Sequence, residues 1–563
     1  MLDKHKGKIN KLSLLTGIGV MLVAVGVGEN SIAYALPDAG SIAAGVNQDR
    51  GWKPNGDEPE VNVDLGEINP AENNIKIKIN SFEIDIDTDK VDKNELAKVI
   101  AGDVKDEASF SDLQQTAAKL TAYLHQHGYM TAIAYLPTQE IVDGVVKIEV
   151  MIGHYGETSY DNTSELCTSR ADGFTHPSRT GKLIRRQPMD KLLLIMNDIP
   201  GVKAHAFLSP GKQDGRADVR YQLTTTETDG GYMYVDNYGS RYTGRWRIGG
   251  GYYWNNLSHV GDQVQIGYLQ SFGNNIQNYD VRYQLPVGNF GTFAGIEFYR
   301  TDYQLGLEYT PQDIRGTSHG VRLFTRSSMK RTLNNNWYFL TELSKTNLSD
   351  RINILETDSQ KHNLAFRFGF DGDNRNSHSA STYKLMHSVG HLTLNSQYAQ
   401  EYNYYGTEGT WQKTTLDVYH IEKLNNCFEL HTSMSAQYPW TNLDSSEKIY
   451  IGGYNAVRAF PQGETGGDMG VYGTAELRYQ TGNPHWQVAA FYDAGWTEYN
   501  HRALDDGAEN TRTLQGAGVG IIWNDNGRSF GRLDFSYPIG KRYSNSYGEK
   551  IGGTVWFRFI HRI

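Results

Sequence analysis

The 563-residue chain is poor in cysteine and has almost no long hydrophobic runs. Its two cysteines, Cys167 and Cys427, exclude a disulfide-stapled scaffold and a cysteine-rich zinc protein, and we expect both to remain free thiols. A single apolar stretch near the N-terminus and a mean hydropathy of −0.55 exclude a bundle of transmembrane helices. The 54 Lys and Arg are outnumbered by 64 Asp and Glu, which argues against a dedicated nucleic-acid binder.

Glycine and tyrosine are abundant, with 60 and 36 residues. A transmembrane β-barrel places lipid-facing and lumen-facing side chains alternately along each strand, so its average hydropathy resembles that of a soluble protein. The composition is therefore compatible with a membrane barrel although it excludes membrane helices.

The N-terminal segment has the pattern of an export signal. Several lysines precede an apolar stretch at residues 12–27, and an Ala-Tyr-Ala sequence ending at Ala35 fits a small-x-small cleavage site. We predict a signal peptide at residues 1–35. The alternative is an uncleaved membrane anchor, for which the apolar stretch is short.

Two small α+β modules are predicted next. They follow residues 36–74, which combine a short helix with a linker rich in Pro, Gly, Asn, Asp and Glu. The first module, residues 75–160, has a strand at 75–79, a helix with Ser111 as its N-cap, and two further strands. The second module, residues 161–227, repeats a helix followed by two strands, which suggests a duplicated domain.

From residue 228 to 563 the chain is a succession of aromatic segments of period 2, separated by Gly, Asn, Asp and Ser. Residues 363–370, for example, place Leu and Phe on one face and Asn and Arg on the other. Such a strand suits lipid on one side and a wet lumen on the other. About 16 such segments are present. They begin near Gly230, Gly244, Gly261, Gln277, Gly291, Gly316, Asn335, Lys361, Ala380, Gly409, Asn426, Met469, Trp486, Leu514, Gly531 and Gly552.

The predicted fold class is therefore an all-β transmembrane barrel of about 16 antiparallel strands, preceded by the two small α+β modules. A run of soluble β-sandwiches or a propeller is the alternative. No blade-length repeat supports it, and charged residues recur through the strands.

Several stretches resemble, in their order and spacing, the two-partner secretion transporters, the TpsB-type hemolysin activator/secretion family of outer-membrane proteins. These stretches are residues 120–144, 204–221, 235–262, 281–288 and 452–464. The resemblance covers essentially the whole mature chain. It implies that residues 75–160 and 161–227 are polypeptide-transport-associated (POTRA) domains in the periplasm. It also implies that residues 228–563 form a barrel in the bacterial outer membrane and that the helix at 36–49 occupies its pore.

The most specific similarity lies in a long connection, residues 441–468, between the predicted eleventh and twelfth strands. The corresponding loop of the family carries a Val-Arg-Gly-Tyr/Phe tetrad and folds back into the lumen. Here the tetrad reads Val457, Arg458, Ala459 and Phe460. If the third position requires a positive φ, its alanine carries strain that a glycine would not.

A partner motif is found on the predicted thirteenth strand. Phe491, Asp493 and Gly495 share one face of that strand, because side chains alternate along it. The resemblance implies that Arg458 meets Asp493 inside the barrel, where a guanidinium and a carboxylate can form two parallel hydrogen bonds. The alternative is a solvated Arg458 and an Asp493 that pairs with a neighbouring strand.

No motif for catalysis or cofactor binding is found. The sequence has no metal-ligand spacing, no Walker loop for phosphate and no Gly-x-Ser-x-Gly nucleophile elbow. We therefore expect no enzyme activity, no cofactor, no metal site and no nucleotide as an energy source.

The resemblance implies a function, namely translocation of a large exported partner polypeptide of the hemolysin or adhesin type across the outer membrane. The POTRA domains would capture this partner unfolded, and the barrel, surrounded by outer-membrane lipid, would pass it through its pore. Nucleic acid is not an expected partner. One alternative is an outer-membrane protein assembly insertase of the same superfamily. Another is a diffusion porin, which would lack both modules and the loop motif.

Overall fold

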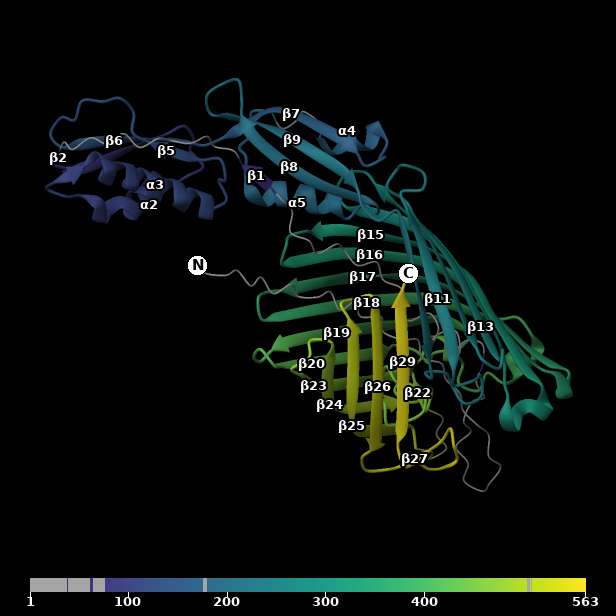
Figure 1. Cartoon of the computed structure of the whole chain (residues 1–563). Helices are drawn as coiled ribbons and strands as arrows, with labels where there is room; N and C mark the ends of the chain where they lie inside the picture. Colours follow the sequence, from purple (N-terminus) through teal and green to yellow (C-terminus); the bar gives the residue numbers. More distant parts are fainter. Residues whose placement is uncertain (1–37, 39–60, 64–75, 176–179, 504–506, 508) are drawn as a thin grey trace.

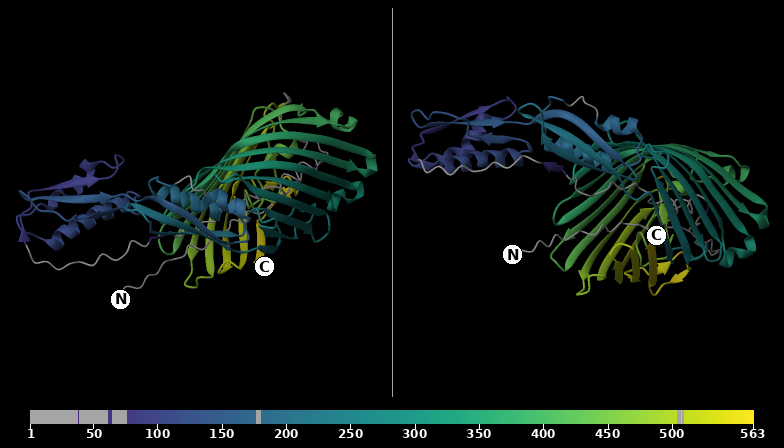
Figure 2. Two further views of the ribbon diagram at one scale, coloured as in Figure 1. Left: turned by 90° about the horizontal axis from the view of Figure 1, so that it is seen from above. Right: turned by 45° about the horizontal axis from the view of Figure 1, so that its top comes forward.

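The computed structural model describes residues 38, 61–63, 76–175, 180–503, 507 and 509–563. A large β-barrel forms the C-terminal part, and two small α+β modules extend in a row from one of its rims (Figures 1 and 2). The signal peptide predicted at 1–35 and, apart from Asp38, the helix predicted at 36–49 lie outside the described residues. Among the residues that are described, no helix is long and apolar enough to cross a membrane.

The first module is a three-stranded sheet with two helices packed against it. Its elements are β2 (Lys76–Ile77), β3 (Ser81–Ile86), α2 (Lys93–Ile100), η1 (Ala101–Asp103), β4 (Ala108–Ser109), α3 (Phe110–Gln126), β5 (Ile133–Tyr135) and β6 (Val145–Met151). The sheet has the order β3-β6-β5, with β3 parallel and β5 antiparallel to β6. Leu120 and Leu124 of α3 and Leu96 of α2 are fully buried against Ile148 of the sheet.

Two local predictions in this module were wrong. The N-cap of α3 is Ser109, not Ser111, because Ser109 and Asp112 form a capping box that satisfies backbone N–H groups at the helix start. The hydrogen bonds from Ser109 lower the pKa of Asp112 to about 2. The strand predicted at 75–79 is reduced to β2, which pairs only with β4, while β3 takes the place in the sheet.

The second module is a four-stranded sheet covered by helices. Its elements are β7 (His154–Thr163), α4 (Thr168–Thr175), α5 (Arg186–Asn197), β8 (Val202–Pro210) and β9 (Arg216–Thr225), joined by β1 (Val61–Val63) from the linker. The strand order is β1-β8-β9-β7. Because β7 pairs in parallel with β9, its backbone hydrogen bonds belong to the second sheet. The boundary expected between residues 160 and 161 therefore moves to the position before His154.

Sixteen strands close the barrel in the described part of the chain, and all neighbouring pairs are antiparallel. They are β10 (Asp229–Asp236), β11 (Arg247–Asn255), β12 (Gln263–Ser271), β13 (Ile276–Val287), β14 (Thr292–Gln304), β15 (Ile314–Lys330), β16 (Asn335–Ile352), β17 (Thr357–Arg375), β18 (Ser379–Leu394), β19 (Gly409–Lys423), β20 (Phe428–Pro439), β23 (Met469–Gln480), β24 (Trp486–Glu498), β25 (Thr511–Asp525), β26 (Ser529–Pro538) and β29 (Thr554–Arg562). Each begins within a few residues of its predicted start. The predicted fold class is confirmed.

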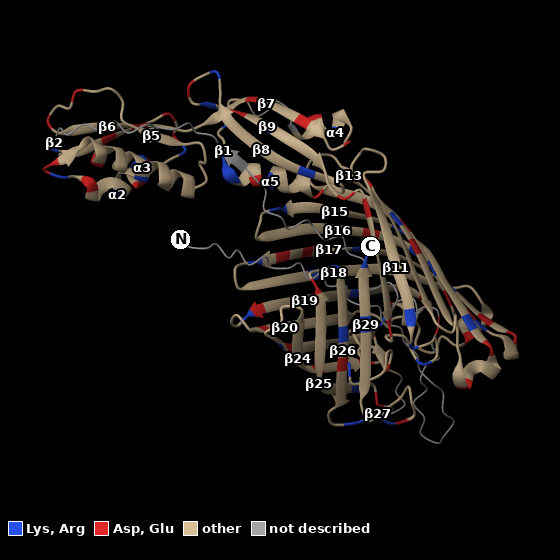
Figure 3. Cartoon of the chain, in the orientation of Figure 1, with Lys and Arg blue, Asp and Glu red and all other residues tan. Residues whose placement is uncertain are grey.

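The two faces of the barrel differ as lipid and water require. On β17, Leu364, Phe366 and Phe370 point outward and are between 41% and 48% exposed, whereas Asn363 on the other face is buried. Basic and acidic residues are interspersed along the strands that can be seen in Figure 3. An apolar outer surface around a polar lumen is the arrangement of an outer-membrane barrel.

A buried ion pair fixes the second module to the barrel rim. Arg331, in the turn between β15 and β16, donates from Nε and Nη2 to both carboxylate oxygens of Asp198 at 2.9 and 2.8 Å. Asp198 is the C-cap of α5, and both side chains are 2% exposed. Burial raises the pKa of Asp198, and the guanidinium acts against that rise. Arg170 of α4 adds hydrogen bonds to the carbonyl oxygens of Pro286 and Gly288, so several turns of the rim hold the module.

The loops at the opposite rim are longer and contain short elements. These are η3 (Leu307–Gln312), η4 (Asn353–Leu355), α6 (Gln397–Glu401), η5 (Ser445–Glu447), β21 (Ile449–Tyr450), β22 (Gly466–Gly467), β27 (Tyr543–Ser544) and β28 (Glu549–Lys550).

Candidate functional site

The connection between β20 and β23, residues 440–468, folds into the barrel. Within it, β21 and β22 form a short antiparallel hairpin. In the segment that connects these two strands, the side chains of Val457, Ala459 and Phe460 are 0% exposed, although they belong to a loop. The loop predicted at 441–468 therefore lies between the eleventh and twelfth barrel strands, with its tetrad packed inside.

Arg458 binds carboxylates from three strands of the barrel wall. Its Nε and Nη2 donate to the two carboxylate oxygens of Asp493 on β24, at 2.9 and 2.8 Å. Its Nη1 donates to Glu476 of β23 at 2.8 Å and to Asp534 of β26 at 3.3 Å. The guanidinium carbon lies 3.3 Å from the ring centroid of Phe491, which adds a cation–π contact. The structure thus forms the pair between Arg458 and Asp493 that the resemblance implied.

Two further arginines balance these charges. Arg532 of β26 donates to Asp534 at 2.9 Å and to Glu476 at 2.6 Å, and Arg478 of β23 donates to Glu476 at 2.6 Å. We refer to the whole set as the lumenal charge cluster, which consists of Arg458, Arg478, Arg532, Glu476, Asp493 and Asp534. Three guanidinium groups face three carboxylates, so the cluster is neutral while the loop is in place.

The partner motif on β24 receives the loop at three points. Phe491 stacks on the guanidinium, and Asp493 pairs with it. At Gly495, an added Cβ would come within 3.2 Å of Val457 Cγ2 and of Ile451 Cβ, so the missing side chain makes room for the loop. All three residues face the lumen, so one face of β24 contacts the tetrad.

Ala459 adopts no left-handed backbone conformation, since it is not among the described non-glycine residues with positive φ. The strain considered for this alanine therefore does not arise. Its carbonyl oxygen accepts a hydrogen bond from Thr554 Oγ1 at 3.2 Å. Its methyl group packs against Gly516 of β25, where an added Cβ would come within 2.3 Å of the Ala459 Cβ. An alanine in the loop and a glycine in the wall are thus complementary.

Gly516→Ala is expected to displace the loop tip, because two methyl groups cannot occupy this space. Overpacking of this kind costs about 1–3 kcal/mol. The double variant Gly516→Ala/Ala459→Gly removes the second methyl group and should restore docking of the loop tip. Protease cleavage within residues 440–468 of folded barrels measures the position of the loop. A double variant as sensitive as the single one would show that this contact does not hold the tip.

Two buried glutamates, which the sequence pattern did not single out, anchor the rest of the loop. Glu464 accepts hydrogen bonds from Arg512 of β25 and, at 2.6 Å, from Ser544 of the β26–β29 connection. Glu447 of η5 accepts one from Arg367 of β17 at 2.8 Å. Each partner comes from a strand or loop distant in the sequence. The spacing of residues within the loop therefore could not predict these contacts.

Asp38 belongs to the segment predicted as a plug helix, and it contacts this same loop. Its carboxylate accepts hydrogen bonds from Lys361 Nζ on β17 at 3.3 Å and from the hydroxyl of Ser445 in η5. The described residue of that segment is therefore connected to both the barrel wall and the loop.

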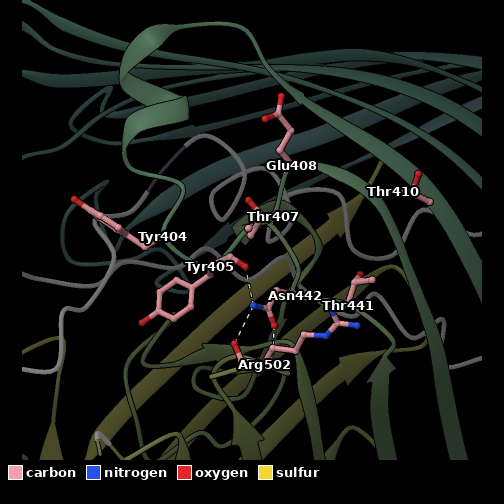
Figure 4. A pocket seen from close by; sticks show the side chains of 9 residues that line it. Tyr404, Tyr405, Thr407, Glu408, Thr410, Thr441, Asn442 and Arg502 are labelled. Atoms are coloured by element: carbon pink, nitrogen blue, oxygen red, sulfur yellow. Dashed lines mark hydrogen bonds between the residues drawn. The ribbon is translucent and has the colours of Figure 1, made fainter. Parts of the chain in front are cut away.

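A pocket of about 440 Å³ lies where the loop begins (Figure 4). It is lined by Tyr404, Tyr405, Gly406, Thr407, Glu408, Thr410, Thr441, Asn442 and Arg502. Asn442 donates to the carbonyl oxygens of Tyr405 and Arg502 at 2.7 and 3.0 Å, so it links three loops of this rim. Within the described ranges, no group of three or more His, Cys, Asp or Glu could hold a metal ion.

Comparison with known proteins gives consistent matches over the whole architecture. A profile of the family described as haemolysin secretion/activation protein ShlB/FhaC/HecB matches residues 215–522. A profile of the POTRA domain, ShlB-type, matches residues 77–153, ending just before β7. The heme/hemopexin transporter protein HuxB of Haemophilus influenzae is 26% identical over 533 residues, covering 92% of this chain and 94% of that protein.

Solved structures share the fold at lower identity. CdiB from Escherichia coli superposes with a TM-score of 0.65 at 18% identity, covering 88% of this chain and 92% of that one. BamA from Haemophilus ducreyi lacking POTRA domains 1–3 gives a TM-score of 0.53 at 14% identity, covering 86% of this chain and 100% of that one.

Proposed function

Because this chain belongs to the haemolysin secretion/activation family ShlB/FhaC/HecB, we propose a specific mechanism by which it exports its partner. The chain is an outer-membrane transporter of a large secreted protein, with its POTRA modules in the periplasm. In the proposed mechanism these modules capture the partner as an extended chain, and the barrel passes it outward. The observation that carries this proposal is a closed barrel whose lumen holds a loop from one rim and whose other rim carries two modules.

Capture is proposed to occur by β-augmentation. Small sheets with open edges bind extended peptides through main-chain hydrogen bonds, largely independently of sequence. Both modules have such sheets, with the orders β3-β6-β5 and β1-β8-β9-β7. A partner that arrives unfolded in the periplasm suits this mode of binding.

Passage requires the loop at 440–468 to leave the lumen or rearrange there. We propose that folding of the partner outside the cell supplies the driving force, since the sequence offers no nucleotide site. As part of the same proposal, the chain catalyses no reaction, uses no cofactor, binds no nucleic acid and contacts outer-membrane lipid through its apolar outer face. Residues 1–35 serve as the export signal, and residues 36–74 supply the plug helix and linker.

An assembly insertase of the same superfamily is the second candidate. The likeness of the fold to BamA supports it, but that structure superposes less well than CdiB. The family profile covers more than half of the chain and favours the secretion transporter.

Deletion of residues 75–227 tests capture by the modules. Export of the partner, identified as the large exported protein encoded beside this chain, should be lost while the barrel still inserts. Heat-modifiable migration of the barrel on gels reports insertion, and partner in the medium reports export. A second deletion, of residues 75–153 alone, shows whether the second module suffices. Unimpaired export by the larger deletion would exclude the proposed capture step.

A further inference from the structure

Strands β15, β16 and β17 are longer than a membrane requires, and they lie side by side in the barrel wall (Figure 1). They contain 17, 18 and 19 residues. About 9–11 residues of a tilted strand are enough to cross the hydrocarbon layer. Their outward side chains therefore cover the apolar band of the membrane and also the headgroup region next to it.

The outward face of β16 changes from apolar to charged at Lys345. Trp337, near the turn that holds the second module, stacks on Tyr383 of β18 with 4.6 Å between ring centroids. Aromatic residues of this kind mark the edge of the apolar band. Along a strand tilted by about 40°, the distance from Trp337 to Lys345 corresponds to a rise of roughly 20 Å, in a band about 25 Å tall. Lys345 thus lies near the outer boundary of the hydrocarbon.

Lys345 is an exposed cation between apolar neighbours. Its register partners are Val321 of β15 and Leu364 of β17. Within the described part of the chain, its ammonium group forms no ion pair with a carboxylate. A lysine on the lipid-facing side destabilises a barrel unless it is near the interface. Its long stem lets the ammonium group reach the headgroup layer, where an anion can bind it.

Hydrogen-bonding side chains continue outward from this lysine. Asn347 of β16 has His319 of β15 and His362 of β17 as its direct register partners. In the next outward row, Ser349 lies between Thr317 and Gln360. Directly opposed residues of neighbouring strands have Cβ atoms about 5 Å apart, so each row presents closely spaced polar groups.

The charges on the neighbouring strand are already matched. Arg300 of β14 pairs with Asp302 at 2.8 Å, so Lys345 carries the unmatched charge of this face. On the membrane side of Lys345, Leu343 has Leu323 and Phe366 as register partners, and all three are exposed. One surface therefore presents an apolar row, a free cation and two polar rows, in that order.

We propose that this surface binds a phosphorylated glycolipid of the outer leaflet. The phosphate binds Lys345 through a charge-assisted hydrogen bond. The acyl chains pack on the row of Leu343, and the sugar hydroxyls meet the rows of Asn347 and Ser349. A phospholipid would fill the first two positions only, because its headgroup ends near the phosphate. The site lies on the outside of the wall and is distinct from the lumen and from the modules.

Lys345→Gln tests the site in the full-length protein in detergent. The probe is lipid A that carries inner-core sugars, and native mass spectrometry measures how much of the protein holds it at each probe concentration. Lys345→Gln should weaken binding about tenfold, because the charge-assisted hydrogen bond is lost. Lys345→Arg keeps the charge and should stay within about twofold of wild type. Lys330→Gln is the matched control, since Lys330 is exposed at the opposite end of β15. Wild-type affinity of Lys345→Gln would overturn the proposal.

Two further probes identify which part of the lipid is recognised. Removal of the phosphates from the same glycolipid should weaken binding to wild type about tenfold and should leave binding to Lys345→Gln unchanged. Phosphatidylglycerol, which has a phosphate but no sugar, should bind wild type at least tenfold more weakly than the glycolipid. Equal affinity for the two lipids would overturn the assignment of a glycolipid. No exported partner is present in this assay, so its outcome is independent of the proposed export mechanism.

Discussion

Arg458→Ala is expected to reduce export of the partner to a small fraction of the wild-type level, while the barrel still inserts. The substitution leaves Glu476, Asp493 and Asp534 facing two guanidinium groups instead of three. Removing one partner of a buried ion pair costs about 3–5 kcal/mol, which corresponds to a shift of roughly 10²–10⁴ in the equilibrium constant for loop docking. The strand ladder of the barrel does not include this loop, so insertion continues.

The readouts are partner in the medium and heat-modifiable barrel in the outer membrane. Asp493→Ala should give the same phenotype, because it removes the bidentate acceptor. Arg458→Lys keeps the charge but loses the planar fork, so an intermediate level is expected. Arg300→Ala is the matched control, since the Arg300 side chain on β14 is 58% exposed and forms its ion pair with Asp302 of the same strand. Normal export by both Arg458→Ala and Asp493→Ala would contradict a role for the pair.

Asp198→Ala is expected to detach the second module from the barrel rim and to reduce export severely. The change leaves the Arg331 guanidinium buried, with the oxygens of Thr332 and Asn336 as its neutral acceptors. Removing one partner of a buried ion pair costs about 3–5 kcal/mol, and the remaining contacts include the hydrogen bonds from Arg170 to two carbonyl groups. A module that swings away from the rim no longer delivers its partner to the pore.

Protease sensitivity between the module and β10 measures this detachment. Asp198→Leu/Arg331→Met replaces the pair by apolar side chains, an exchange that is often neutral for stability, so docking should recover. Lys212→Ala, which alters an exposed pair with Glu157, is the surface control. If Asp198→Ala remains docked and exports normally, the ion pair does not hold the module.

The barrel could be predicted strand by strand because each strand separates lipid from water. Side chains that face lipid and lumen alternately give every strand a period-2 pattern. The starts of β17 and β25 were therefore predicted to within a few residues of their observed positions. The modules were harder. In β7, only Tyr155 and Gly156 are buried, so the strand carries little apolar signal and its membership in the second sheet was missed.

Contacts between distant segments explain the remaining differences. The pair of Arg458 and Asp493 was predicted from a resemblance. The contacts of Asp534 and Glu464 could not be predicted in this way, because they join segments that are far apart in the sequence. The three residues of β1 are too few to show a pattern, and their pairing exists only because β8 offers an edge. The start of α3, by contrast, could have been predicted from the sequence, because Ser109 and Asp112 have the spacing of a capping box.

The balanced lumenal charge cluster has a consequence for ion selectivity. In the proposed mechanism the loop withdraws and takes Arg458 with it, which leaves three carboxylates of the wall beside Arg478 and Arg532. The open wall is therefore more acidic than the closed one, and a lysine or arginine of a passing chain can occupy the vacated position. The conductance of Gly516→Ala barrels should accordingly favour cations over anions.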